Sequence, residues 1–132
     1  MSCWPSQAQF SQLATRLSQP LINVAPIAKV CFDPFVDEEQ CQVVHERFND
    51  GLWRADQPGA AMNSNWEASD GMTTSCFAGN ATYFAPSNGT CEQGRVPVVG
   101  VNATRPEDVQ EAVKFASEHN LRLVVKNTGY AC

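Results

Sequence analysis

The strongest constraint on the fold is a strand–helix–strand pattern in the last third of the chain. The segment RVPVVGVN (95–102) predicts a short apolar strand, and LRLVV (121–125) predicts a second one. Between them, Thr104 to Glu107 fits a helical capping box with proline in the first turn, and the helix ends at Asn120. Together these elements predict a βαβ unit with parallel strands. The predicted apolar face of the helix comprises Val109, Ala112, Val113 and Ala116.

The residues after the second strand are where a ligand-binding loop is expected. In open α/β sheets, ligands bind beyond the carboxyl ends of the strands, and KNTGYAC (126–132) occupies that place. Gly129 would let the backbone approach a ligand closely, and successive N–H groups in such a turn suit a pyrophosphate. Lys126 could offset phosphate charge, although a solvated lysine fits the residues equally well. An ordinary glycine turn is the alternative for Asn127, Thr128, Gly129 and Tyr130.

Composition argues against several classes of function. The chain has 132 residues, which is long enough for one domain with a real core. It has 9 Lys and Arg residues and 14 Asp and Glu residues, so the net charge is -5. Without a basic block, neither nucleic acid nor an anionic membrane is an expected partner. No stretch approaches the roughly 18 apolar residues of a membrane span, and MSCWPSQ at the start lacks the pattern of a secretory signal.

Six cysteines and three glycosylation sequons point instead to an oxidising compartment. No C-x-x-C pair occurs, so a zinc or thioredoxin-type motif has little support. Scattered cysteines in a small chain are typical of disulfides, although sequence alone leaves the pairing open. Candidate bridges are Cys31–Cys41 and Cys76–Cys91, whereas Cys3 and Cys132 have no obvious partners. The sequons mark candidate glycosylation sites at Asn80, Asn88 and Asn102.

The first two thirds predict two helices followed by a long irregular segment. A helix is expected over 5–19, with one apolar face formed by Phe10, Leu13 and Leu17. An extended run over 21–32 follows and is interrupted at its proline. Asp37 should cap a second helix that ends at Gly51 and buries Cys41, Val44 and Phe48. Residues 51–94 are rich in Gly, Asn, Ser, Thr and Pro. An irregular segment of this length is expected to be held by disulfides or to have a function.

Several strings resemble one family of flavoproteins. VPVVGVNATRPEDVQEAVKFASEHNLRLVVKNTG (96–129) resembles the first part of the FAD-binding domain of fungal FAD-linked oxidoreductases. These are the berberine-bridge-enzyme-like and isoamyl-alcohol-oxidase-like members of the vanillyl-alcohol-oxidase (PCMH-type) superfamily. CWPSQAQFSQL and LWRADQPG resemble the segment before that domain. The implied fold class is α+β / α/β, with an N-terminal helical, disulfide-containing segment over 1–94 and a βαβ unit over 95–132 that begins a PCMH-type FAD-binding domain.

The resemblance also implies a cofactor and a reaction. Family members oxidise alcohols or secondary-metabolite intermediates, passing hydride to FAD, which oxygen reoxidises. Tyr130 stands where many members carry a histidine that anchors the flavin covalently, so FAD would be bound non-covalently here. The implied cofactor-binding residues are Lys126, Asn127, Thr128, Gly129 and Tyr130. Since the match covers only the beginning of such an enzyme, we expect no turnover by this chain alone.

No catalytic or metal-binding set emerges from the residues. His119 suits a helix C-terminus, where a cation is favourable, and His45 is expected on a helix surface. Two functional hypotheses remain. The first is a truncated FAD-linked oxidoreductase whose partners are FAD, a small-molecule substrate and a complementary or full-length relative. The alternative is a non-enzymatic, disulfide-stapled secreted or interaction protein. Both place the chain in the secretory pathway or outside the cell.

Overall fold

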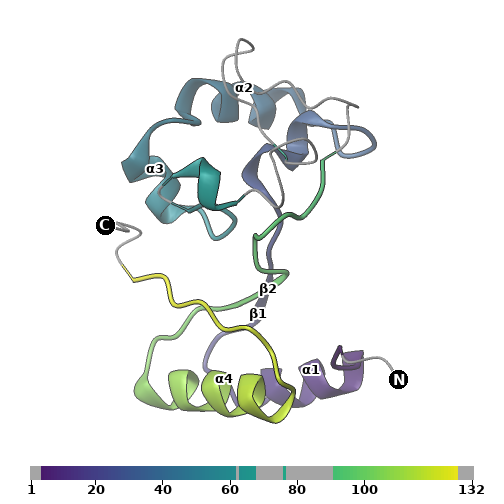
Figure 1. Cartoon of the computed structure of the whole chain (residues 1–132), viewed down its shortest axis with the longest axis vertical. Helices are drawn as coiled ribbons and strands as arrows, with labels where there is room; N and C mark the ends of the chain where they lie inside the picture. The colour runs from purple at the N-terminus through teal and green to yellow at the C-terminus, as the bar shows by residue number, and fades with distance from the viewer. Residues whose placement is uncertain (1–3, 62, 68–75, 77–90, 128–132) are drawn as a thin grey trace. The chain divides into compact units, whose positions relative to one another are not determined.

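The chain forms two compact units in the computed structural model (Figure 1). The structure describes residues 4–61, 63–67, 76 and 91–127. The first unit comprises the described residues up to Asn23 and Val99–Val125. The second unit comprises the described residues of Val24–Val98 together with Lys126 and Asn127. The predicted domain boundary after residue 94 does not coincide with a boundary between these two units, and it stays a prediction.

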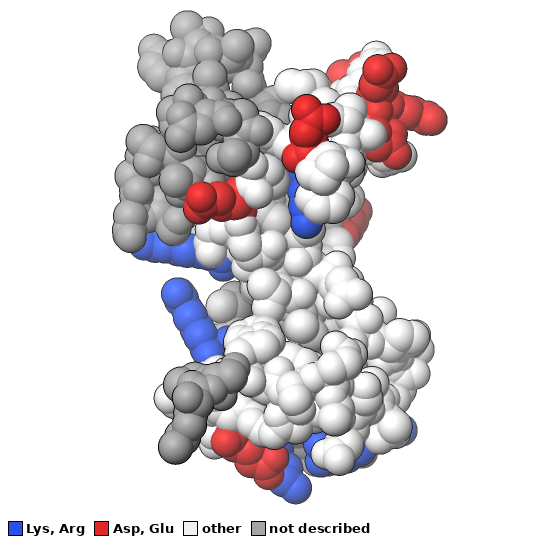
Figure 2. Space-filling view, turned by 90° about the vertical axis from the view of Figure 1, so that its right-hand side faces the viewer, with Lys and Arg blue, Asp and Glu red and all other residues white. Residues whose placement is uncertain are grey.

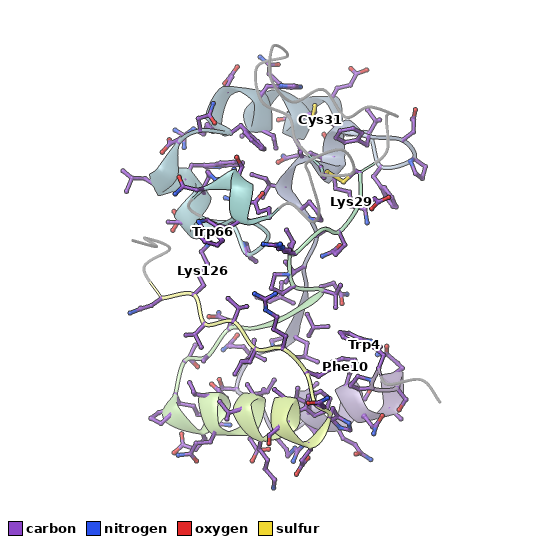
Figure 3. All side chains as sticks on the ribbon, in the orientation of Figure 1. Trp4, Phe10, Lys29, Cys31, Trp66 and Lys126 are labelled. Carbon is purple, nitrogen blue, oxygen red and sulfur yellow. A yellow bond between two sulfur atoms is a disulfide. The ribbon has the colours of Figure 1, made fainter. Side chains whose placement is uncertain are left out.

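Two helices supply the core of the first unit. α1 (Gln7–Ala14) starts at Ser6, whose hydroxyl accepts the Gln9 N–H while the Gln9 side chain accepts the Ser6 N–H. This capping box fixes the start of the helix, which is shorter than the predicted 5–19. Phe10 of α1 packs against Phe115 of α4 (Pro106–Glu118) with ring centroids 5.3 Å apart. The ring centroids of Trp4 and Phe10 are 5.8 Å apart (Figure 3).

The sheet of the first unit pairs segments distant in sequence. β1 (Leu21–Asn23) runs antiparallel to β2 (Val99–Val101), with Ile22 opposite Gly100. The mixed helix-and-strand fold class is confirmed, but the predicted parallel pairing with 121–125 is not formed among the described residues. That apolar segment forms neither a helix nor a strand. Side-chain patterning marks extended segments, whereas the choice of partner is non-local and was not readable from it.

α4 ends as predicted, begins one residue later than predicted, and buries only part of the predicted apolar face. Asn120 has φ 50°, and the Leu121 N–H donates to the Ala116 carbonyl at 2.8 Å, which completes a Schellman motif. Val109 and Val113, predicted to be buried, are 50% and 47% exposed. Ala116, from the predicted face, is buried, and the neighbouring Phe115 lies in the core with Phe10 and Leu13.

The described residues of the second unit form two short 3₁₀ helices and two α-helices. They are η1 (Ile27–Cys31), α2 (Glu38–Arg47), α3 (Gly51–Asp56) and η2 (Ser64–Trp66). The Asp37 carboxylate accepts the Gln40 N–H at 3.0 Å, so the predicted cap of α2 is confirmed. Gly51, predicted to end that helix, begins α3 because the Asp50 side chain caps a new helix there.

Both candidate disulfides are present in the second unit. Cys31 of η1 is bonded to Cys41 of α2, and Cys76 is bonded to Cys91. Around them, a core comprises Ala28, Val44, Phe48 and Cys76. Cys3 and Cys132 lie outside the described residues.

Charged side chains are unevenly distributed over the surfaces of the two units. Residues 4–15 carry no charged side chain, and Figure 2 shows a broad uncharged surface on the first unit. Acidic side chains appear on the second unit in the same view, and Asp37, Glu38 and Glu39 stand at the start of α2. Among the described residues, the helices are too short and too polar for any of them to span a membrane.

Candidate functional site

The structure describes only the first two residues of the predicted cofactor loop. Lys126 and Asn127 are described, and Asn127 is exposed. Thr128, Gly129 and Tyr130 lie outside the described residues. The candidate site is therefore built from Lys126 and from the residues of the second unit that surround its side chain.

The Lys126 ammonium group is bound by three backbone carbonyls. It donates to the carbonyl oxygens of Arg54 at 3.0 Å, Gln57 at 2.7 Å and Ala60 at 3.0 Å. Arg54 and Gln57 lie at the end of α3, where helix carbonyls lack intrahelical partners and favour a cation. Since an ammonium has three donors, all of them are engaged. Lys126 therefore fixes the start of the predicted loop, and its role as a phosphate partner stays a prediction.

Removing these donors should destabilise the second unit. We expect Lys126→Met, which keeps the length of the side chain, to lower the free energy of unfolding by about 1–3 kcal/mol, because three carbonyls lose a charged donor. Chemical denaturation followed by tryptophan fluorescence measures this loss. Lys114→Met, at an exposed position of α4, is the matched control and should change stability by less than about 0.5 kcal/mol. Equal effects of the two substitutions would contradict the structural role of Lys126.

A buried ion pair lies next to this carbonyl cluster. Arg54 and Glu67 are only 1% and 7% exposed, and the guanidinium Nη2 donates to Glu67 Oε1. Arg54 Nη1 donates to the Phe48 carbonyl at 2.9 Å, and Nε donates to the Ala61 carbonyl at 2.8 Å. Glu67 Oε1 also accepts the Ala61 N–H at 2.7 Å. Both backbone groups of Ala61 are thus held by the pair, which fixes the loop over residues 57–61.

Burial dominates the electrostatics of this pair. Desolvation raises the pKa of Glu67 to about 6, although the charge of Arg54, the Ala61 hydrogen bond and the charge of Lys126 oppose the rise. Burial likewise lowers the pKa values of Arg54 and Lys126. Glu67 Oε2 has no hydrogen-bond partner among the described residues. A shifted carboxyl can serve acid–base chemistry, but this one is closed off from solvent and holds backbone in place, which favours a structural role.

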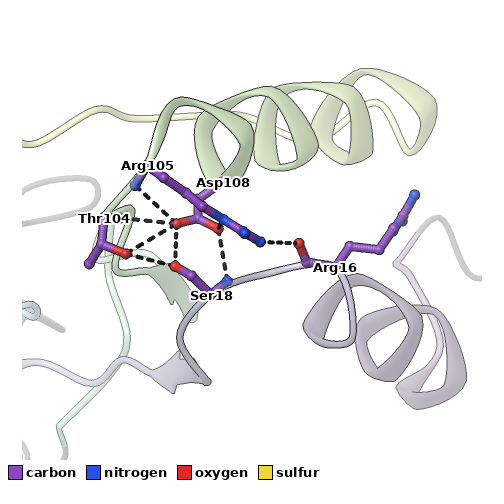
Figure 4. Close-up of polar contacts among 5 residues, drawn as sticks. All are labelled: Arg16, Ser18, Thr104, Arg105 and Asp108. Atoms are coloured by element: carbon purple, nitrogen blue, oxygen red, sulfur yellow. Dashed lines mark hydrogen bonds and ion pairs between the residues drawn. The ribbon is translucent and has the colours of Figure 1, made fainter.

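A second polar cluster holds the first unit together around Asp108 (Figure 4). Its buried carboxylate accepts the N–H groups of Ser18 at 2.8 Å and of Thr104 at 3.0 Å, together with the Ser18 hydroxyl. It also accepts the N–H and Nε–H of Arg105, both at 3.2 Å, and Arg105 Nη2 continues to the Arg16 carbonyl. Asp108 therefore fills the capping position that the sequence assigned to Glu107, and it joins α4 to the chain after α1.

The Asp108 cluster should make the first unit sensitive to acid. The hydrogen bonds from the Ser18 hydroxyl and from the N–H donors hold the pKa of Asp108 well below its ordinary 3.8, although desolvation acts to raise it. Because the pKa of this carboxyl is lower in the folded state, its ionised form stabilises the fold at pH values above its unfolded-state pKa of about 3.9. This stabilisation is lost as the pH falls from about 3.9 toward the folded-state pKa. We expect Asp108→Asn to lower thermal stability at neutral pH, and its difference from the parent chain to shrink below pH 3.8.

Far-UV circular dichroism during heating at several pH values measures this effect. Glu107→Gln, at the exposed neighbouring position, is the matched control and should leave the melting curve nearly unchanged. If Glu107→Gln were the more damaging substitution, the capping assignment in the structure would be wrong.

The remaining predicted sites are placed only in part. Asn102 is exposed just after β2, so it is accessible to glycosylation, whereas Asn80 and Asn88 lie outside the described residues. Sequence reasoning named none of Arg54, Glu67 and Asp108. The signals were weak, since a charged residue next to tryptophan in LWRAD or NWE usually lies on the surface.

One cavity among the described residues lies on a single helix. A shallow cavity of about 500 Å³ lies on the outer face of α4. It is lined by Val109, Gln110, Val113, Lys114, Ser117 and Glu118. Because one helix supplies this lining, the cavity is an open surface rather than an enclosed site.

Comparisons with known proteins place the chain next to fungal flavoproteins. No family model matches it. It is 41% identical over 128 residues to the FAD-linked oxidoreductase penH of Penicillium thymicola and to the FAD-linked oxidoreductase asqF of Emericella nidulans. Both alignments cover 97% of this chain and 21% of the relative, so the chain spans about a fifth of the length of these proteins.

Solved structures give the same result. The VAO-type flavoprotein MtVAO615 of Myceliophthora thermophila C1 matches 98% of this chain with a TM-score of 0.78 and 30% identity. The VAO-type flavoprotein MtVAO713 of the same fungus matches with a TM-score of 0.73 and 27% identity. This chain corresponds to 22% of each of those chains.

Proposed function

We propose that this chain, a homologue of the N-terminal fifth of fungal FAD-linked oxidoreductases and VAO-type flavoproteins, supplies the beginning of the FAD-binding domain of a flavin-dependent oxidoreductase. The proposal rests on one observation, the match over 97% of the chain at 41% identity to an FAD-linked oxidoreductase. The whole protein would oxidise an alcohol or a secondary-metabolite intermediate. Hydride would pass to FAD, and oxygen would reoxidise the cofactor.

Within such a protein, this chain would position a cofactor loop. Lys126, bound to the end of α3, sets the point from which Asn127 and the next residues approach FAD. FAD would be held without a covalent bond, because Tyr130 replaces the family histidine. The cofactor supplies the hydride acceptor when it is bound. The groups that enclose its ring and that act on the substrate would come from further polypeptide, so we expect no turnover by this chain alone.

A chimera tests the proposal. This chain replaces the matching N-terminal fifth of the penH oxidoreductase, and the purified protein is examined for flavin absorbance and for flavin fluorescence after denaturation. We expect the chimera to copurify with FAD that denaturation releases. The intact relative is the positive control, and the relative without its N-terminal fifth is the negative control. A soluble, folded chimera without flavin would overturn the proposal.

The second candidate is a non-enzymatic, disulfide-stapled secreted or interaction protein. The two disulfides and the internally bonded cluster of Lys126, Arg54 and Glu67 support it, since they hold the second unit together without a ligand. Under this proposal, the purified chain is soluble and all six cysteines are oxidised. Two or more free thiols per chain would exclude it.

We also propose that the chain passes through the secretory pathway. Disulfides form and persist there, and Asn102 is exposed within a sequon. After expression in a secreting fungal host, glycosidase treatment should increase the electrophoretic mobility of the chain. Mobility that the enzyme leaves unchanged would count against glycosylation in that pathway.

A further inference from the structure

A series of contacts connects a buried carboxyl to the start of the predicted cofactor loop. Glu67 is 7% exposed, and its Oε1 accepts the Ala61 N–H at 2.7 Å and a hydrogen bond from the Arg54 side chain. Ala60, the residue before Ala61, provides its carbonyl to the Lys126 ammonium at 3.0 Å. Arg54 provides its own backbone carbonyl to the same ammonium, also at 3.0 Å. Glu67 therefore contacts the residues that position two of the three carbonyls around Lys126.

We propose that ionisation of Glu67 strengthens the binding of the Lys126 ammonium to these carbonyls, so that pH determines how firmly the start of the cofactor loop is fixed. The step moves one proton between the Glu67 carboxyl and solvent, and no other reactant takes part. Lys126 is bound more tightly when Glu67 is a carboxylate and less tightly when it is a neutral acid. The consequence for FAD rests on the function proposed above.

The charges around Lys126 set the direction of the effect. When Glu67 is neutral, the buried Arg54 guanidinium loses the charge of its partner and repels the Lys126 ammonium. When Glu67 is ionised, its charge offsets that of Arg54 and attracts Lys126. The pKa of Lys126 reflects this balance, because burial and the charge of Arg54 lower it, whereas the charges of Glu67 and Asp56 act to raise it.

Glu67 can change its charge under ordinary conditions. Burial raises its pKa to about 6, although the charge of Arg54, the Ala61 hydrogen bond and the charge of Lys126 act to lower it. Since coupling between two sites is reciprocal, a Lys126 charge that favours ionised Glu67 is itself bound better when Glu67 is ionised. Glu67 Oε2 has no hydrogen-bond partner among the described residues, so it can carry the proton without losing a contact.

The other charged groups near this cluster are exposed. Asp56, in the last turn of α3, acts on the charge of Lys126, but its side chain is in contact with solvent. Arg95 contacts Glu67 through its backbone N–H, which donates to the Glu67 carbonyl at 2.8 Å, and its side chain is also exposed. Solvent screens exposed charges more than buried ones. Glu67 is therefore the group whose ionisation changes the charge beside Lys126 most.

The expected direction is opposite to that of global stability. A carboxyl with a raised folded-state pKa contributes most to stability at low pH, and this contribution declines as the pH rises through about 6. The binding of Lys126 becomes stronger over the same pH range. A general loss of folding would instead release Lys126 at high pH, so the two effects can be separated in one protein.

Competitive acylation of lysines tests the proposal in the full chain. The chain is labelled with a trace of acetic anhydride at pH values from 5 to 8, and mass spectrometry compares the labelling of Lys126 with that of Lys114, which is exposed on α4. The ratio cancels the general effect of pH on the reactivity of amines. Since a bound ammonium reacts slowly, we expect the ratio to fall by at least about fivefold from pH 5 to pH 8. A ratio that stays constant or rises would overturn the proposal.

Two variants identify the group that titrates. Glu67→Gln should give the same labelling ratio at pH 5 and at pH 8, because its amide stays neutral. Asp56→Asn, which removes an exposed carboxylate that acts on Lys126, should keep the pH dependence of the parent. Parent-like pH dependence in Glu67→Gln would count against the role of Glu67. If Glu67→Gln does not fold, the ratio in the parent, measured beside its urea denaturation at each pH, still decides.

The chimera with the penH oxidoreductase tests the consequence for the cofactor. After dialysis, the chimera should retain a larger fraction of its FAD at pH 8 than at pH 5, and Glu67→Gln should remove this difference. Equal retention at the two pH values would overturn the link between Glu67 and the cofactor loop. A folded chimera that never binds flavin would overturn the proposed function, and acylation of the chain alone would then decide whether Glu67 controls Lys126.

Discussion

Arg54→Ala is expected to lower the free energy of unfolding of the second unit by about 3–5 kcal/mol. The substitution removes the partner of Glu67, whose carboxylate is 7% exposed, and it leaves the carbonyls of Phe48 and Ala61 without their donors. Breaking one side of a buried pair is costly because the remaining charge stays buried and unpaired. Urea denaturation followed by tryptophan fluorescence and by far-UV circular dichroism measures the loss.

The loss should depend on pH in a defined direction. Burial raises the pKa of Glu67 to about 6, so its carboxyl is mostly neutral at pH 5 and charged at pH 8. A raised folded-state pKa means that the contribution of Glu67 to stability is full below its unfolded value of 4.5 and declines as pH rises through about 6. Arg54→Ala removes the cation that offsets this decline, and its cost should therefore be larger at pH 8 than at pH 5.

Two variants control the result. Arg47→Ala removes an exposed arginine from α2 and should change stability by less than about 0.5 kcal/mol. Arg54→Leu combined with Glu67→Leu removes both charges and should cost less than Arg54→Ala alone, since no buried charge remains unpaired. If Arg54→Ala and Arg47→Ala were equivalent, the buried pair would contribute nothing to the fold.

Local signals in the sequence were enough to predict helix ends and disulfides. Asp37 caps α2, and Asn120 ends α4, because a cap needs only residues within one turn of the helix. Cys31–Cys41 and Cys76–Cys91, the two candidate bridges, join cysteines that are 10 and 15 residues apart, although the sequence alone left the pairing open. In each case the determining contacts lie close in sequence.

Non-local contacts could not be predicted in the same way. β2 pairs with β1 from the other end of the chain, and no property of either segment names the other. Arg54 and Glu67 are charged, so hydropathy assigns them to the surface, and only the fold brings them together in the interior. Lys126 was predicted at a functional loop from its position, but the carbonyls that bind its ammonium lie 66 to 72 residues earlier.

The loop over residues 57–61 is where these non-local contacts meet. Gln57 and Ala60 provide carbonyls to Lys126, and Ala61 is held by both members of the buried ion pair. Gly59, between them, lies against the backbone of Ala25, whose carbonyl oxygen is 1.9 Å from the position of a Cβ atom built on Gly59. The loop that fixes the start of the predicted cofactor segment thus depends on a position that has no room for a side chain.

Gly59→Ala should consequently be the most damaging small substitution in the second unit. A Cβ atom cannot approach a backbone oxygen closer than 3.0 Å, so either the 57–61 loop or Ala25 must move by more than 1 Å. That movement would disturb the carbonyls that bind Lys126. We expect a loss of about 3 kcal/mol or more in the free energy of unfolding, at the upper end of overpacking effects, measured by urea denaturation.

Gly51→Ala is the matched control, because nothing lies within 4 Å of its added Cβ at the first position of α3. It should be neutral or stabilising by up to about 1 kcal/mol, since alanine favours helix over glycine. If both variants unfolded at the same urea concentration, the close approach of Gly59 to Ala25 would be wrong, and with it the account of how the start of the cofactor loop is held.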